Sequence, residues 1–363
     1  MKTDKSIPSP PICVGFDAKR YFNNPTGLGN YARWLVNGLL ANNQLSIKLF
    51  TPKLPISTSN YEIIGATGLW KSFKGLWRIR GINADLIRSK IDVYHGLSNE
   101  LPFGIHKTDI KTVVTIHDCI NLRFPENYKL LDRLIYKHKL RYAQNVADTI
   151  VVPSKQTKED LIHYFKTSES KIKVIPLSVP SVPHFKKETK KPYILCISSF
   201  DKRKNLGNLV KAYQNIDSIP YPLVIAGKMG HQFDTLKKSI DKTDSIKLIS
   251  NPSTEQIHSL YNNAVFCVYP SLFEGFGIPI LEAFLHGKTV ATSNLSSLPE
   301  VGGDAVIYFN PNDPNDMKQA ITRLIDDKYR FTLEQQVSNQ LAKFDSKLLL
   351  AQYYNVYVNL VKH

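Results

Sequence analysis

The chain has 363 residues, and at roughly 150 residues per domain this length predicts two domains, each able to bury a sizeable core. Lysine and arginine (47) exceed aspartate and glutamate (31) by 16 charges. This excess favours an anionic partner, which can be a phosphorylated substrate, a nucleic acid or an acidic membrane surface. The first residues lack an apolar signal core, and no run approaches the ~20 apolar residues of a membrane span, so we expect a cytoplasmic protein.

The first half of the chain alternates short apolar runs with amphipathic segments, which is typical of a parallel α/β domain. We expect strands at 11–17, 91–94, 111–116, 150–154 and 173–177, and helices at 31–40, 132–146 and 158–165. The four cysteines fall in or next to such apolar runs, without close pairing, and are predicted to be reduced core residues.

A glycine motif follows the first predicted strand. Gly27-Leu-Gly29-Asn-Tyr-Ala32 formally matches the dinucleotide fingerprint G-x-G-x-x-A. However, about ten residues separate the strand from the glycines, which is too many for the tight turn, and no acid follows roughly twenty residues later. A nicotinamide-dependent oxidoreductase therefore stays as an alternative, beside the simpler interpretation that the glycines open the helix at 31–40.

Residues 70–90 interleave aromatic rings (Trp70, Phe73 and Trp77) with six basic residues, among them Arg78. Such a segment suits an anionic membrane surface, with its rings at the headgroup level. A nucleic-acid surface would have a similar composition. The third interpretation is the solvated face of an ordinary core helix, and the sequence leaves all three open.

Histidines follow two of the predicted strands. His95 comes after the strand at 91–94, and His117 after the strand at 111–116. Because ligands of open α/β sheets bind beyond the carboxyl ends of the strands, both side chains are expected at a ligand-binding edge. A lone histidine at a strand end is often only a satisfied polar residue, and we give His95 that interpretation.

A proline- and lysine-rich stretch without apolar periodicity, 178–192, predicts a linker. Alternation then resumes, with strands expected at 193–198, 223–227, 246–249, 265–269 and 289–293. Helices are expected at 206–214, 254–262, 280–286, 316–326 and 346–361. Arg203 and Lys204 lie at the first strand-to-helix turn, where a bidentate guanidinium and an ammonium suit a diphosphate.

The most informative stretch is Glu274-Gly-Phe-Gly-Ile-Pro-Ile-Leu-Glu282. Pro279 suits the first turn of a helix and Gly287 suits its end. The helix N-terminus would attract an anion, and the glycines allow a ligand to approach the backbone closely. A phosphate flanked by two carboxylates that accept hydroxyl groups indicates a nucleotide sugar. From spacing alone, an ordinary loop and helix with two solvated glutamates fits as well.

This stretch resembles the Glu-x7-Glu signature of retaining glycosyltransferases of the GT-B fold, glycosyltransferase family 4. The resemblance extends over nearly the whole chain. The overall sequence pattern is similar to that of bacterial mannosyltransferases of surface polysaccharide assembly. It implies catalytic roles for Glu274, His117, Arg203 and Lys204. It implies donor binding by Gly27, Gly29, Arg203, Lys204, Glu274, Gly275, Phe276, Gly277, Ile278 and Glu282. Many members begin the loop after residue 196 with Gly-Arg, whereas this chain has Ile197-Ser198.

The resemblance implies an α/β architecture of two doubly wound, Rossmann-like domains that face a cleft. We expect an acceptor-side domain at 1–182 joined by a C-terminal helix at about 345–363, a linker at 183–192, and a nucleotide-sugar domain at 193–344. The expected reaction moves a hexose, preferably mannose from GDP-mannose, to a saccharide or lipid-linked saccharide with retention.

No Asp-x-Asp occurs in the sequence, and the basic pair can offset the diphosphate charge, so no metal and no cofactor are expected. Peripheral contact with an anionic membrane is expected, and nucleic acid is not. A non-catalytic basic protein that binds nucleic acid or membrane remains the other alternative.

Overall fold

The computed structural model describes residues 10–55, 61–180, 191–240 and 245–362, and the chain divides into two compact units. Unit 1 comprises Met1–Pro153, Thr157–Pro176 and Ser346–His363, and unit 2 comprises Ser154–Gln156 and Leu177–Asp345. The predicted linker 183–192 lies outside the described residues except for its last two positions. Within the described residues, none of the helices combines the length and apolar character that crossing a bilayer demands.

Unit 1 is built on a seven-stranded sheet in the order β3-β2-β1-β4-β5-β6-β7, in which each pair of neighbours is parallel. Its central strands consist almost entirely of buried residues, as expected for a sheet covered on both faces. The strands are β1 (Ile12–Asp17), β2 (Leu45–Thr51), β3 (Glu62–Gly65), β4 (Val93–Gly96), β5 (Lys111–Thr115), β6 (Thr149–Val152) and β7 (Ile172–Val174).

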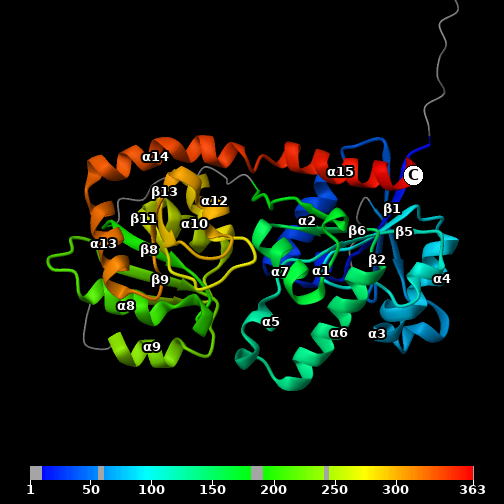
Figure 1. The fold of residues 1–363 in the computed structure, drawn as a ribbon, viewed down its shortest axis with the longest axis horizontal. Helices are drawn as coiled ribbons and strands as arrows, with labels where there is room; N and C mark the ends of the chain where they lie inside the picture. The colour runs from blue at the N-terminus through cyan, green and yellow to red at the C-terminus, as the bar shows by residue number, and fades with distance from the viewer. Residues whose placement is uncertain (1–9, 56–60, 181–190, 241–244, 363) are drawn as a thin grey trace, which may run out of the picture. The chain divides into compact units, whose positions relative to one another are not determined.

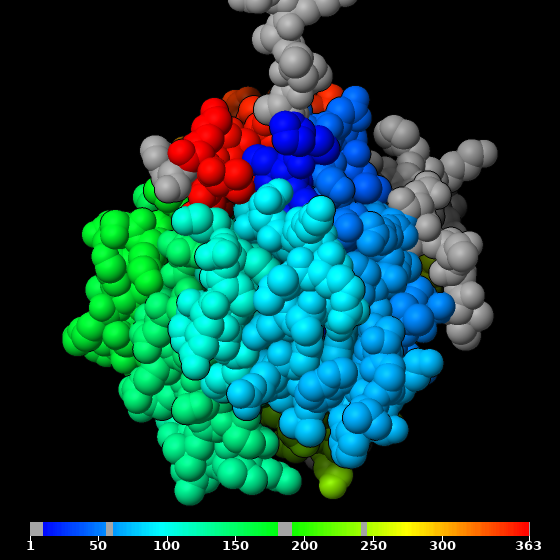
Figure 2. All heavy atoms as spheres, turned by 90° about the vertical axis from the view of Figure 1, so that its right-hand side faces the viewer, coloured from blue at the N-terminus to red at the C-terminus, as the bar shows by residue number. Residues whose placement is uncertain are grey.

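The helices of unit 1 include several short turns between residues 68 and 88. Figure 2 views unit 1 from the side on which α3 and α4 lie. The α-helices are α1 (Lys19–Asn23), α2 (Gly27–Leu39), α3 (Lys74–Leu76), α4 (Ile82–Arg88), α5 (Ile120–Arg123), α6 (Leu130–Val146), α7 (Lys155–Phe165) and α15 (Ser346–Lys362). The 3-10 turn η1 (Gly68–Lys71) and the π-helical turn η2 (Trp77–Gly81) flank α3.

The last helix, α15, completes unit 1 although it follows unit 2 in the chain. It packs against α2, β1 and β4 (Figure 1), and it buries Tyr353 and Tyr357 completely. The Tyr357 hydroxyl lies 2.8 Å from His95 Nδ1, and His95 Nε2 lies 2.8 Å from the Thr115 hydroxyl. His95 therefore has the structural role that the sequence suggested, because both ring nitrogens are satisfied inside the core.

Unit 2 contains a six-stranded parallel sheet in the order β10-β9-β8-β11-β12-β13. Its strands are β8 (Tyr193–Ile197), β9 (Leu223–Gly227), β10 (Ile246–Ser250), β11 (Ala264–Tyr269), β12 (Val290–Ser293) and β13 (Val306–Phe309). Its α-helices are α8 (Leu206–Gln214), α9 (Phe233–Ile240), α10 (Thr254–Asn263), α11 (Ile278–Leu285), α12 (Leu298–Gly302), α13 (Pro314–Ile325) and α14 (Asp327–Ala342).

Both sheets have the doubly wound strand order that the family resemblance implied. In each sheet the order reverses once, between β1 and β4 in unit 1 and between β8 and β11 in unit 2. Loops on the two sides of such a switch point separate and leave a crevice beyond the carboxyl ends of the strands, which is where ligands of this architecture bind. The topology therefore directs attention to the loops that follow β8 and β11.

Candidate functional site

The loops after β8 and β11 are held together by hydrogen bonds across the switch point of unit 2. The Leu272 N–H donates to the Arg203 carbonyl (3.0 Å), and the Asn205 side-chain amide donates to the Pro270 carbonyl (3.2 Å). Asn205 adopts a left-handed conformation (φ 58°) between the 3-10 turn η6 (Lys202–Lys204) and α8. These contacts hold Arg203 and Lys204, in the loop after β8, against the loop after β11, which carries Glu274.

At this junction three predicted residues form one cluster. Lys204 Nζ lies 2.6 Å and Arg203 Nη1 lies 2.9 Å from the same oxygen, Glu274 Oε1. Arg203 Nη1 also donates to the Phe273 carbonyl at 2.5 Å. Glu274 and Lys204 are buried, with 8% and 9% of their surface exposed, while Arg203 is partly exposed. One carboxylate therefore faces two cations, which leaves a local excess of one positive charge.

The electrostatics of the cluster follow from its burial. Desolvation alone would raise the pKa of Glu274, but the charges of Lys204 and Arg203 outweigh it and lower that pKa to about 2. Burial lowers the pKa of Lys204, and the neighbouring Glu274 carboxylate partly opposes this effect. The Glu274 carboxylate is therefore ionised at neutral pH, and it is held between the Lys204 and Arg203 side chains before any ligand arrives.

Tyr269 belongs to the cluster, and the sequence analysis did not single it out. Its hydroxyl accepts a hydrogen bond from Lys204 Nζ (3.0 Å) and donates one to Glu274 Oε1 (2.8 Å). The ring is buried at the carboxyl end of β11. The sequence did contain a signal for Tyr269, because it is the last residue of the predicted strand that leads into the loop with Glu274.

The segment between Glu274 and α11 is shaped by its backbone. Gly277 has a φ of 130°, which favours glycine, and it precedes the first residue of α11, Ile278. The Ser297 hydroxyl lies 2.9 Å from the Glu274 carbonyl and 2.6 Å from the Phe276 carbonyl. The Phe276 ring is buried against Phe344, so its side chain is not available to a ligand.

The start of α11 corrects the expected place of Glu282. The helix begins at Ile278, two residues before the predicted start, so Glu282 lies in its second turn and not in its first. The Tyr261 hydroxyl donates to Glu282 Oε2 at 2.9 Å. Burial raises the pKa of this carboxyl, and the Tyr261 hydrogen bond partly offsets that rise. Glu282 remains partly exposed and can accept a further hydrogen bond.

The two glycines at the start of α2 have different surroundings. A β-carbon on Gly29 would lie 1.7 Å from the Asn24 carbonyl oxygen, so the loop packing itself requires glycine there. A β-carbon on Gly27 would meet no atom within 4 Å. The dinucleotide fingerprint fails in the structure because α1 lies between β1 and the glycines, where a tight strand-to-helix turn would be needed.

His117 lies beyond the carboxyl end of β5 in unit 1, as expected. Its Nε2 is 2.9 Å from the Leu97 carbonyl, and the Tyr31 ring contacts it edge-on. Burial lowers its pKa to about 4, so the ring is neutral at pH 7. Because a carbonyl only accepts, Nε2 carries the hydrogen. Nδ1, for which the described residues offer no hydrogen-bond partner, is therefore left as an acceptor.

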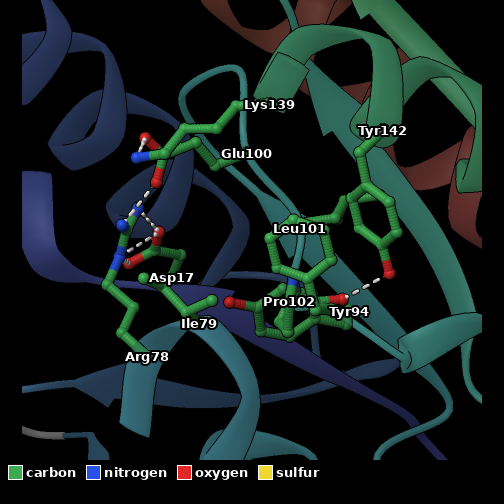
Figure 3. A pocket seen from close by; sticks show the side chains of 10 residues that line it. Asp17, Arg78, Ile79, Tyr94, Glu100, Leu101, Pro102, Lys139 and Tyr142 are labelled. Atoms are coloured by element: carbon green, nitrogen blue, oxygen red, sulfur yellow. Dashed lines mark hydrogen bonds and ion pairs between the residues drawn. The ribbon is translucent and has the colours of Figure 1, made fainter. Parts of the chain in front are cut away.

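The interpretation of residues 70–90 as a membrane contact is wrong for two residues of this segment. Trp77 is fully buried, and its indole N–H donates to Asp85 at 2.7 Å. Arg78 is also turned inward, where it pairs with Asp17 and Glu100 at 2.5 Å each, as Figure 3 shows. The adjoining cavity measures about 20 Å³, enough for one water but not for a sugar ring, so we assign this charged cluster a structural role.

Two parallel sheets of Rossmann-like order define a protein of the GT-B architecture. The structure resembles that of sucrose-phosphate synthase from Thermosynechococcus elongatus with a TM-score of 0.76 and 18% identity, over 96% of this chain and 99% of that one.

The sequence narrows this class to a family. The model of Glycosyltransferase Family 4 matches residues 25–181, and the model of Glycosyl transferases group 1 matches residues 180–343. The chain therefore belongs to the family 4 glycosyltransferases. Neither alternative class, a nicotinamide-dependent oxidoreductase or a non-catalytic basic protein, is favoured by these matches.

Two curated relatives come from Escherichia coli. The O-antigen chain mannosyltransferase B is 32% identical over 258 residues, which cover 66% of this chain and 66% of the relative. The serotype-specific mannosyltransferase WbdA is 29% identical over 283 residues, which cover 70% of this chain and 34% of the relative. The chain thus matches just under two thirds of the first relative and about a third of the second.

Proposed function

We propose that this protein transfers mannose from GDP-mannose to a hydroxyl group of a saccharide acceptor, with retention of the anomeric configuration. The observation that carries the proposal is the buried Arg203–Lys204–Glu274 cluster at the switch point of unit 2. The choice of mannose is supported by the mannosyltransferase names of the relatives.

The cluster suits a donor that carries both phosphates and hydroxyl groups. Arg203 and Lys204 supply two positive charges, and the first N–H groups of α11 supply the positive end of a helix dipole. Arg203 Nη1 and Lys204 Nζ both contact Glu274 Oε1, so a diphosphate that binds beside them competes with this carboxylate and loosens its ion pairs. The released carboxylate is then available to accept hydroxyl groups of the sugar, while Glu282 accepts from the ribose.

We assign supporting roles to unit 1. His117 Nδ1 is a neutral acceptor that suits a hydroxyl of the transferred hexose. Gly27 and Gly29 lie in the first turn of α2. The Gly29 N–H donates to the Thr26 carbonyl (2.9 Å), so we assign contact with a donor phosphate to the Gly27 backbone, whose surroundings are open.

In the proposed step the acceptor oxygen bonds to the anomeric carbon on the face from which the diphosphate departs. The bond between that carbon and the phosphate oxygen breaks, and the acceptor proton passes to the departing phosphate. The charge that develops on the phosphate is stabilised by Arg203, Lys204 and the α11 N-terminus, which are already in place. We propose that these groups replace a divalent cation and that the reaction needs no metal.

The test has two parts. Thermal unfolding should shift upward with GDP, less with UDP and not with NAD, since a ligand that binds only the folded state stabilises it. GDP-mannose with a mannose-terminated acceptor and EDTA present should then give a product whose new linkage has the α configuration by NMR. A shift with NAD alone, an inverted linkage, or activity abolished by EDTA and restored by Mg²⁺ would each overturn the corresponding part.

A further inference from the structure

The N-terminal half of α6 carries an apolar face that stays largely exposed among the described residues of unit 1. The inner face of the helix is buried through Leu140 and Ala143. On the outer face four large aliphatic side chains are mostly in solvent: Leu130 (66% exposed), Leu131 (67%), Leu134 (56%) and Ile135 (46%). Contiguous apolar surface of this kind marks a site of interaction rather than an ordinary solvated helix.

Basic residues continue the same face. At 100° per residue, Leu130, Leu134, Lys137 and Arg141 fall within about 60° of one another around the helix. Lys137 and Arg141 are exposed, as is Lys129 just before the helix, and none of the three forms an ion pair with any residue of the described ranges. Asp132, the one acid of α6, points about 160° away from Leu130.

A second apolar and basic segment lies at the same end of unit 1. Residues 68–76, which include η1 and α3, are all exposed. Both views place α3 and the start of α6 at the lower end of unit 1 (Figures 1 and 2). A groove lined by Trp70, Leu76 and Arg80 reaches Tyr142 in the C-terminal half of α6, and Leu130, Leu134 and Lys137 line a second groove. The exposed apolar residues of this segment are Leu69, Trp70, Phe73 and Leu76.

We propose that this end of unit 1, which we call the docking face, binds the surface of an anionic phospholipid bilayer, with α6 lying in the interface. Aliphatic residues followed by unpaired bases on one helix face are what an interfacial helix requires, since the apolar groups enter the acyl boundary and the bases meet lipid phosphates. The chain's excess of 16 positive charges acts in the same direction.

This inference deepens the proposed function by naming the surface that would bring the enzyme to a lipid-linked acceptor. It replaces the segment 70–90 as the main membrane contact, because Trp77 and Arg78 of that segment are buried. Trp70 and Phe73 remain part of the docking face, while α6 supplies the larger apolar area.

Vesicle sedimentation tests the proposal with the full chain and without catalysis. The wild type should bind vesicles that contain phosphatidylglycerol and should not bind pure phosphatidylcholine vesicles. One variant carries Leu130→Gln, Leu131→Gln, Leu134→Gln and Ile135→Gln, and it should lose binding. A second variant carries Lys129→Gln, Lys137→Gln and Arg141→Gln, and it should bind roughly a hundredfold more weakly, since each base near an anionic surface contributes about fivefold.

A control variant changes one exposed apolar residue and one exposed basic residue in unit 2. Phe331 of α14 is 60% exposed and Lys328 lies one turn before it. The double variant Phe331→Gln with Lys328→Gln should bind vesicles as the wild type does. All variants should keep the wild-type melting temperature, because the changed side chains are exposed.

Three results would overturn the docking face. They are a wild type that ignores anionic vesicles, an α6 variant that still binds them, and a concentration-dependent dimer that the α6 changes abolish while vesicle binding persists. Transfer of mannose to a soluble acceptor is measured in parallel. Normal transfer without vesicle binding would refute only the docking, whereas vesicle binding without transfer would refute only the proposed function.

Discussion

Glu274 is the residue whose surroundings the structure defines most sharply, because its Oε1 pairs with both cations that we assign to the diphosphate. We predict that Glu274→Gln abolishes transfer but leaves GDP binding unchanged or tighter, since the amide no longer competes with phosphate for Arg203 and Lys204. Calorimetry with GDP and a transfer assay measure the two effects.

Glu282→Ala serves as the contrast to this substitution. It should weaken GDP binding by about 1–3 kcal/mol, through the loss of a hydrogen-bonded acceptor beside the proposed ribose position. If Glu274→Gln weakens GDP binding as much as Glu282→Ala does, the carboxylate holds the cations in place rather than competing for them.

His95 makes the stability of unit 1 depend on pH. Burial lowers its pKa to about 3 in the folded chain, whereas an unfolded histidine titrates near 6.5. Below about pH 6.5 the unfolded state binds a proton that the folded state does not. The free energy of unfolding therefore falls as the pH drops toward 3, by up to about 1.4 kcal/mol per pH unit. His117, with a pKa near 4, adds to the effect.

We therefore expect His95→Gln, which keeps polar groups facing Tyr357 and Thr115, to reduce the loss of melting temperature between pH 6.5 and 4. Thermal unfolding followed at several pH values measures this slope. His138→Gln, at an exposed position of α6, is the control and should leave the slope unchanged. Parallel curves for His95→Gln and wild type would contradict the assignment.

At the level of elements, the two glycines at the start of α2 have different roles. Gly29 is required by packing, and Gly27 is the one to which we assign a role in binding. We predict that Gly29→Ala destabilises the protein by about 1–3 kcal/mol, because the new methyl group overlaps the Asn24 carbonyl and the turn must move. Gly27→Ala should leave the melting temperature unchanged, since the site is open, yet lower the affinity for donor. Equal melting temperatures for both variants would show that the turn adapts without cost.

Local patterns predicted most of the elements that carry the site. The strands β9 and β11 and the helix α8 were placed within one residue, because buried strands and amphipathic helices have distinct periods. Residues 68–88 were misjudged for a physical reason. Four short turns, one of them π-helical, break the 3.6-residue period, so the sequence could not indicate that Trp77 points inward and Trp70 outward.

The candidate site was likewise predicted only in part. The types and spacing of Arg203, Lys204 and Glu274 marked them as candidates, but their shared oxygen depends on which strands are neighbours, and spacing alone does not determine that. β2 and β3, at the far edge of the sheet, were not predicted, and neither were β13 and α14. The apolar face of α6 was also missed, because the helix was expected to start at 132 and Leu130 and Leu131 were left outside it.

For the whole molecule, the main consequence of the chain path is that unit 1 is completed only by the last helix. Leu349, Tyr353 and Tyr357 of α15 are each at most 1% exposed, and Tyr357 meets His95 in the core. Burial of three such side chains contributes on the order of 5–9 kcal/mol, which is comparable to the total stability of a domain. Unit 1 is therefore expected to need α15 in order to stay folded.

We predict that deleting residues 346–363 abolishes the calorimetric unfolding transition of unit 1 while the transition of unit 2 persists. A synthetic peptide of residues 346–363, added to the shortened chain, should restore the lost transition, because the helix recovers its site on α2, β1 and β4. Tyr357→Phe is the matched control. It keeps the buried ring and removes the hydroxyl facing His95, so it should cost only about 0.5–1.5 kcal/mol. A shortened chain that keeps both transitions would mean that the seven-stranded sheet and its remaining helices form a sufficient core without α15.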